Sequence, residues 1–252
     1  MSRNLEALEQ VQQDQALFHV APVTVNDAAK EPSYRRTVRA NIPTFDLGGF
    51  GREEFLKLAQ RLFLAPDGKD SVCPRQVVFC GIEEGESTGP LCAQFSRILA
   101  SQVTMPVCIV DANVRAPTLH RLLEVDPATD QNLLQSRPWR QVAGNLWLIP
   151  GHAAATDGGV ISTLDQVRSQ INKLPPEFAY VLIIAPPLSN YRDAVLLGQK
   201  ADGVVLVLEA NSTHRAAALK AKKALAAANV QVLGTVLNNR IFPIPEKIYR
   251  WL

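Results

Sequence analysis

A chain of 252 residues, of which 47% are hydrophobic and 20% charged, is long enough to form one domain with a substantial core. The net charge of +2 at pH 7 gives no support for nucleic acid or an anionic membrane as the partner. No run of about 18 apolar residues occurs and the N-terminus has no apolar signal core, so we expect a cytoplasmic protein.

The N-terminal part of the sequence differs from the rest in composition. It is polar and interrupted by Pro22, Pro32 and Pro43, which predicts a weakly ordered arm over residues 1–45. We expect residues 46–252 to form the domain together with a C-terminal tail.

The apolar residues that follow the arm first recur at helical spacing and then gather in short runs. Phe55, Leu58, Leu62 and Phe63 predict an amphipathic helix over residues 51–64. The β-rich runs after it are Val77–Cys80, Val107–Val110, Leu146–Ile149, Val181–Ile184, Val204–Leu208 and Val230–Leu237. Because helical stretches separate most of these runs, we expect an α/β fold with a mostly parallel sheet covered by helices on both faces.

The segment after the first of these strands is a candidate phosphate loop. It reads Gly-Ile-Glu-Glu-Gly-Glu-Ser-Thr-Gly-Pro over residues 81–90, between a strand and a helix N-terminus, where backbone N–H groups favour anions. However, no lysine occurs between Lys69 and Lys173, and Glu83, Glu84 and Glu86 add negative charge. These residues favour an ordinary strand-to-helix turn over a working phosphate loop.

A second motif, Ile-Val-Asp-Ala-Asn-Val-Arg-Ala-Pro-Thr-Leu-His over residues 109–120, makes the chain resemble a known family. Together with the loop and the end of the chain, it resembles the cytoplasmic kinase domain of bacterial tyrosine kinases for capsular and exopolysaccharide synthesis. These kinases are relatives of the MinD and ParA ATPases. The resemblance covers roughly residues 50–250 and implies a P-loop NTPase-like sheet of about six to seven strands.

The same resemblance implies a degenerate site for ATP and magnesium at the loop. The family reads Gly-Glu-Gly-Lys-Ser/Thr here, and Gly85 and Glu86 match its first two residues. Ser87 then replaces a glycine, Thr88 replaces the phosphate-binding lysine, and Gly89 replaces the hydroxyl that binds magnesium. ATP and magnesium are therefore cofactors that the family implies but that this loop is poorly equipped to hold.

Two further motifs show the same loss of charge. Asp111 is retained and is the catalytic candidate if the protein is active, whereas Asn113 stands where the family has a second aspartate. Arg115 borders the nucleotide in the family, so Asn113 and Arg115 are cofactor-binding candidates, although Arg115 also fits an exposed helix side. Ile184 replaces an acidic metal partner, and no metal ligand is predicted.

Two features bear on partners. Glu54, Lys57 and Gln60 stand where the family's oligomerising helix has Glu-x-x-Arg-x-x-Arg, so the segment is either a remnant of that interface or a solvated helix face. Family members end in a tyrosine cluster, but this tail has only Tyr249, which is either packed or a phosphorylation site.

These observations favour a non-catalytic adaptor or regulator of exopolysaccharide or capsule biosynthesis and export. Its expected partners are an inner-membrane polysaccharide co-polymerase, an active kinase homologue or a glycosyltransferase, with homo-oligomers as a further option and no nucleic acid. We expect it in the cytoplasm, peripheral to the inner membrane through a protein partner. The alternatives are an active tyrosine autokinase and a MinD- or ParA-like localisation ATPase. The localisation ATPase is the weaker alternative, because the sequence shows no clear basic amphipathic terminal helix of the kind that such proteins use to bind membranes.

Overall fold

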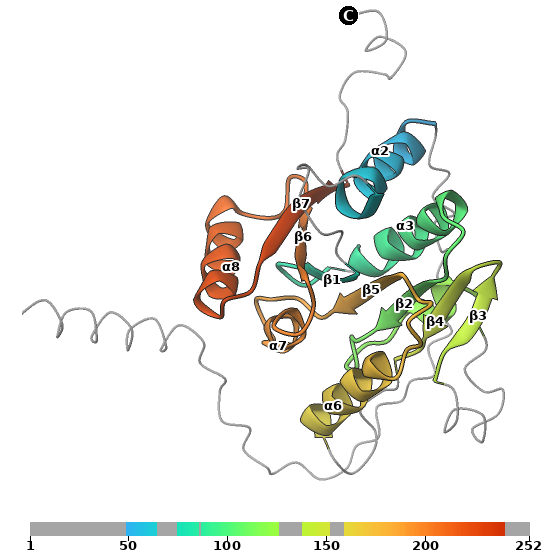
Figure 1. Cartoon of the computed structure of the whole chain (residues 1–252). Coiled ribbons are helices and arrows are strands. Elements are labelled where there is room, and N and C mark those ends of the chain that lie inside the picture. Colours follow the sequence, from blue (N-terminus) through green and yellow to red (C-terminus); the bar gives the residue numbers. More distant parts are fainter. Residues whose placement is uncertain (1–48, 65–74, 86, 126–137, 152–158, 240–252) are drawn as a thin grey trace, which may run out of the picture. The chain divides into compact units, whose positions relative to one another are not determined.

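The computed structural model describes residues 49–64, 75–85, 87–125, 138–151 and 159–239 (Figure 1). The boundary expected near residue 45 and the C-terminal tail lie outside the described residues. The strands are β1 (Gln76–Gly81), β2 (Val107–Asp111), β3 (Arg140–Ala143), β4 (Leu146–Ile149), β5 (Tyr180–Ala185), β6 (Gly203–Glu209) and β7 (Val232–Asn238). The helices are α2 (Gly49–Ala59) with a π-helical continuation (Gln60–Leu64), α3 (Thr88–Gln102), α4 (Leu119–Leu122), α6 (Gly159–Asn172), α7 (Asp193–Gly198) and α8 (Arg215–Ala227).

The strands form one seven-stranded sheet in the order β3-β4-β2-β5-β1-β6-β7. All neighbours pair in parallel except β3 and β4, which are antiparallel. The four central strands consist of almost continuously buried apolar residues, because helices cover them on both faces. The predicted α/β class with a mostly parallel sheet is therefore confirmed. The short edge strand β3 was not predicted.

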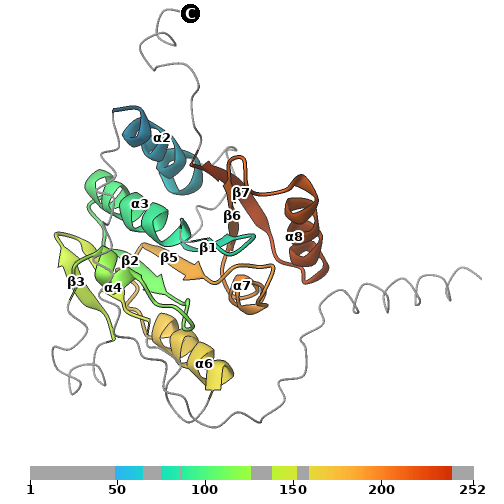
Figure 2. The same cartoon turned by 180° about the vertical axis from the view of Figure 1, so that it is seen from behind.

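Helices cover both faces of the sheet, as Figures 1 and 2 show from opposite sides. On one face, α2 and α3 pack over side chains that point from β1, β2, β5 and β6, and these form one apolar core. On the other face, α6, α7 and α8 contribute to a second core with the alternate side chains of the same strands. This arrangement brings the carboxyl ends of β1, β2, β5 and β6 to one edge of the domain.

An aromatic cluster fixes α3 against the sheet. Phe95 of α3 is fully buried, and its ring centroid lies 5.7 Å from that of Phe79 in β1. The rings of Phe55 and Phe63 lie 5.9 and 6.3 Å from it on the side of α2 and its continuation. The helix predicted over residues 51–64 is therefore part of the core, and its π-helical end places both Leu62 and Phe63 among the buried residues.

The cysteines that the structure describes are buried and free. Cys80, Cys92 and Cys108 have no exposed surface, and burial raises the pKa of Cys80 to about 12. Such thiols stay protonated and behave as small apolar side chains. Cys73 lies outside the described residues.

Candidate functional site

The segment between β1 and α3 forms the expected strand–loop–helix unit at the carboxyl edge of the sheet. The strand ends at Gly81 and the helix begins at Thr88, directly after Ser87. The loop that follows β5 holds the segment in place, since the N–H groups of Leu188 and Ser189 donate to the carbonyl oxygens of Gly81 and Ile82 at 3.1 and 2.8 Å. The position of a phosphate loop is thus preserved.

A cavity of about 20 Å³ lies inside this loop, which is room for a water molecule. Its lining residues come from the loop and from the end of β6: Gly81, Ile82, Glu83, Glu84, Gly85, Ser87, Thr88, Val207, Glu209, Ser212 and Thr213. These described residues include three glutamates and no lysine or arginine. The local charge is therefore negative. Glu86 lies outside the described residues.

Glu209 was not predicted as part of the site. Glu209 is the last residue of β6. A Cβ atom placed on Gly85 would lie 3.0 Å from Oε1 of Glu209, so the Glu209 carboxylate packs against the loop. On the opposite side, Nδ2 of Asn190 donates to Oε1 of Glu84 at 2.5 Å. The only sequence signal for Glu209 was its place at the carboxyl end of a strand, where ligands of α/β sheets bind.

Thr88 and Gly89, which stand where the family has its phosphate-binding lysine and its magnesium-binding hydroxyl, are both tightly packed. Thr88 is buried, and its Oγ1 atom lies 3.1 Å from the place of a Cβ on Gly81. A Cβ on Gly89 would lie 3.0 Å from Oγ1 of Thr118, closer than most real Cβ contacts. A serine or threonine at Gly89 would therefore require Thr118 to move.

Asp111 has both carboxylate oxygens engaged by backbone N–H groups. Its Oδ2 accepts from Thr118 at 2.8 Å and from Leu119 at 2.9 Å, at the start of α4, and its Oδ1 accepts from Asn113 at 3.2 Å. Burial raises the pKa of Asp111 to about 6, and these hydrogen bonds oppose the rise. Gly151 allows the close approach of the chain here, because a Cβ would lie 2.8 Å from the Asp111 carbonyl oxygen.

Asn113 lies in the turn that follows Asp111. Its backbone carbonyl accepts from the N–H of Ala116 at 3.1 Å, and its side-chain Oδ1 lies 3.4 Å from the same nitrogen. The amide that replaces the family's second aspartate therefore stabilises the local backbone.

Arg115 forms a cluster with two residues of the segment after β5. Its guanidinium carbon lies 4.0 Å from the ring centroid of Tyr191, and its Nε lies 3.7 Å from Oδ2 of Asp193. The Asp193 side chain is only 8% exposed, and burial raises its pKa while Arg115 opposes the rise. The resemblance implies that Arg115 borders a nucleotide; in the structure it contacts an aromatic ring and a buried carboxylate.

Replacing Arg115 by alanine should lower the free energy of unfolding by about 1–2 kcal/mol, because Asp193 would lose its countercharge. The estimate is below the range for fully buried pairs, since Arg115 is 34% exposed. Urea denaturation at pH 7 measures the change, and Arg52→Ala, at an exposed position of α2, is the matched control. Equal stability of Arg115→Ala and the native protein would show that the cluster contributes nothing.

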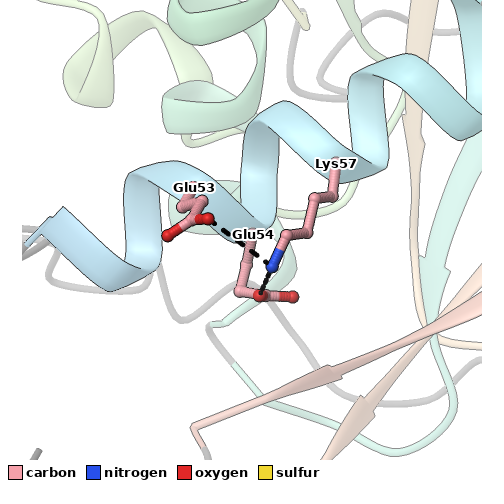
Figure 3. A network of polar contacts seen from close by, with 3 residues as sticks. All are labelled: Glu53, Glu54 and Lys57. Carbon is pink, nitrogen blue, oxygen red and sulfur yellow. Dashed lines mark hydrogen bonds and ion pairs between the residues drawn. The ribbon is translucent and has the colours of Figure 1, made fainter. Parts of the chain in front are cut away.

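The polar residues of α2 interact within their own helix. Figure 3 shows Nζ of Lys57 between two carboxylates, 2.9 Å from Oε1 of Glu54 and 3.8 Å from Oε1 of Glu53. The hydrogen bond from Lys57 to Glu54 raises the pKa of the lysine. All three side chains are at least half exposed, so this surface has the geometry of a solvated helix face.

Within the described residues, no group of three His, Cys, Asp or Glu side chains could hold a metal ion. The described helices include none with the length and hydropathy needed to cross a membrane. Tyr249 lies outside the described residues.

Comparison with known proteins places this geometry among bacterial kinases. No protein-family model matches the chain. Tyrosine-protein kinase YwqD of Bacillus subtilis (strain 168) is 30% identical over 168 residues, which cover 62% of this chain and 68% of the kinase.

Solved structures share the fold at lower identity. The VpsO kinase domain superposes with a TM-score of 0.63 at 18% identity, over 75% of this chain and 94% of that domain. The kinase domain of the Escherichia coli tyrosine kinase ETK superposes with a TM-score of 0.61 at 18% identity, over 77% of this chain and 78% of that domain. MinD from Pyrococcus horikoshii OT3, complexed with Mg-ADP, superposes with a TM-score of 0.52 at 20% identity, over 70% of this chain and 76% of that protein. The predicted MinD-type P-loop NTPase fold is confirmed.

Proposed function

The chain belongs to the family of bacterial tyrosine-protein kinases, and from this premise we propose that it is a non-catalytic member of that family. It acts as an adaptor or regulator in exopolysaccharide or capsule biosynthesis and export. Its partners are an inner-membrane polysaccharide co-polymerase, an active kinase homologue or a glycosyltransferase. Binding to such a partner holds it at the cytoplasmic side of the inner membrane.

The charge around the phosphate loop carries the proposal. Glu83, Glu84 and Glu209 line the small cavity at the phosphate loop, and no described lining residue is cationic. Phosphoryl transfer depends on positive groups that neutralise the transferring phosphate, so this set of residues does not fit ATP with magnesium. Each like-charge contact at 4 Å costs roughly 1 kcal/mol in water and more when water is excluded.

The packing of the remaining positions supports the same proposal. Thr88 stands at the position of the family's lysine and packs against Gly81. Gly89 stands at the position of the hydroxyl that binds magnesium and packs against Thr118. Ile184, at the position of the acidic metal partner, is buried in the apolar core. The carboxylate of Asp111 is already bound by three backbone N–H groups. The fold is kept while each of these positions serves packing or backbone capping.

The second candidate function is an active tyrosine autokinase, which kinship with a protein named a tyrosine kinase favours. In this case the N-terminus of α3 would supply backbone N–H groups to the phosphates. Magnesium-dependent ATP turnover that is lost in Asp111→Ala, with the variant still folded, would support this function over the adaptor.

We expect no saturable binding of a fluorescent ATP analogue below about 100 μM, with or without magnesium, because three carboxylates line the loop. The measurement is a fluorescence titration of the full chain, with YwqD as the positive control. Neutralising the loop in the triple variant Glu83→Gln/Glu84→Gln/Glu209→Gln should raise affinity by about tenfold or more.

The control for this titration is Asp165→Asn, which removes an exposed carboxylate on α6. It should leave binding unchanged. Magnesium-dependent saturation of the native chain would overturn the non-catalytic assignment. Tight binding by the native chain without magnesium would instead indicate a structural nucleotide and leave the adaptor role standing.

A further inference from the structure

Helix α8 carries a concentrated basic charge that the net charge of the whole chain conceals. Its sequence, Arg-Ala-Ala-Ala-Leu-Lys-Ala-Lys-Lys-Ala-Leu-Ala-Ala, has four basic residues and no acidic one. All four basic residues, Arg215, Lys220, Lys222 and Lys223, are exposed. Figures 1 and 2 show α8 at the outer side of the domain, beside β7 and at the end of the sheet opposite β3.

The two faces of α8 differ sharply. Ala221 and Leu225 are buried and belong to the core on that face of the sheet. Leu219 and Lys223 are one turn apart, on the opposite side, and Leu219 is 48% exposed. The solvent face thus has an apolar residue at its centre and basic residues on both flanks.

Three of the four basic residues of this face have no acidic partner among the described residues. Within the described part of the chain, Arg215, Lys222 and Lys223 form no ion pair with a carboxylate. The nearest acidic residue before α8 in the sequence, Glu209, lines the cavity of the phosphate loop. The positive potential of the helix is therefore available to an external partner.

We propose that the outer face of α8 binds an anionic lipid surface directly, with the flanking cations at the headgroups and Leu219 inserted among them. Basic helices with an exposed apolar residue suit this role, because each lysine or arginine adds attraction and the apolar side chain leaves water. The remaining small side chains of the face, Ala216, Ala226 and Ala227, let the helix lie close to a flat surface.

Other classes of partner suit this face less well. Cores of protein interfaces are rich in aromatic residues and arginine and poor in lysine, whereas this face has three lysines and no aromatic residue. Nucleic acid would be attracted by the same charges, but it offers no environment for Leu219 at the centre of the face. The proposed contact is independent of whether the phosphate loop binds ATP, and it adds direct lipid contact to the protein partner of the adaptor.

Co-sedimentation of the full chain with vesicles tests the proposal. Vesicles of phosphatidylglycerol and phosphatidylcholine should bind the native protein with a partition coefficient on the order of 10³ M⁻¹, as expected for Arg215, Lys222 and Lys223 together with Leu219, and pure phosphatidylcholine should not. The double variant Lys222→Gln/Lys223→Gln should bind about 30-fold more weakly. Leu219→Ala should reduce binding severalfold, and high salt should abolish it.

The matched control is Arg52→Gln/Lys173→Gln, which removes two exposed cations from α2 and from the segment after α6. It should retain most of the binding. An equal loss in both double variants would overturn the proposal, because it would indicate attraction to net charge alone. Absence of binding to anionic vesicles would overturn it as well, and binding of a random-sequence DNA duplex that depends on Lys222 and Lys223 would then assign the face to nucleic acid. None of these outcomes would alter the titration with ATP, so the two proposals fail separately.

Discussion

Replacing Phe95 by alanine should lower the free energy of unfolding by about 3–5 kcal/mol, the range for emptying a buried phenylalanine site. The ring is fully buried between β1 and α2, in contact distance of three other aromatic rings. Because α3 continues directly from the phosphate loop, loss of this anchor also loosens the loop. Urea denaturation followed by tryptophan fluorescence measures the effect.

The controls for this variant separate packing from general sensitivity. Leu219→Ala removes an apolar side chain that is 48% exposed and should change stability by less than about 0.5 kcal/mol. If Phe95→Ala does not fold, Phe95→Leu keeps most of the volume and should cost roughly 1–2 kcal/mol. A loss below 1 kcal/mol in Phe95→Ala, about that of an average substitution, would mean that the aromatic cluster does not hold α3.

The buried strands were predictable because their side chains repeat one simple pattern. Runs such as Val77–Cys80 and Val181–Ile184 are apolar at every position, since both faces of the sheet are covered. Strand β3 was missed because its sequence, Arg-Gln-Val-Ala, alternates in burial at the edge of the sheet and has one strongly β-forming residue. The edge strand exists through its pairing with β4, which no local pattern reveals.

The residues of the phosphate loop were predictable from the sequence, but the residues that pack around the loop were not. The replacement of lysine by Thr88 is visible in the sequence, but the carboxylate that faces Gly85 comes from Glu209, more than a hundred residues away. The contact between Asp193 and Arg115 joins the start of α7 to the turn after β2, and no local pattern in the sequence indicates it. The basic face of α8 was hidden because a net charge of +2 averages it with acidic residues elsewhere.

Stability should fall as the pH rises from about 4 to about 6.5, in part because Asp111 is buried. Its pKa is raised by burial from 3.8 to about 6, so the folded state holds a proton that the unfolded state releases. The contribution of Asp111 to the free energy of unfolding is fully present below pH 3.8, its pKa in the unfolded state. It is lost as the pH rises through about 6, its pKa in the folded state. A rise of about two pKa units corresponds to roughly 3 kcal/mol.

The variant Asp111→Asn isolates this contribution, because its amide does not titrate. The free energy of unfolding, measured by urea denaturation from pH 4 to pH 7, should decline more steeply in the native protein than in the variant. Asp165→Asn removes a carboxylate that is 65% exposed and controls for charge loss alone. If the native protein instead gained stability over this range relative to Asp111→Asn, the hydrogen bonds from Asn113, Thr118 and Leu119 would outweigh burial. Asp111 would then be a carboxylate kept charged by the backbone, as a catalytic role would require.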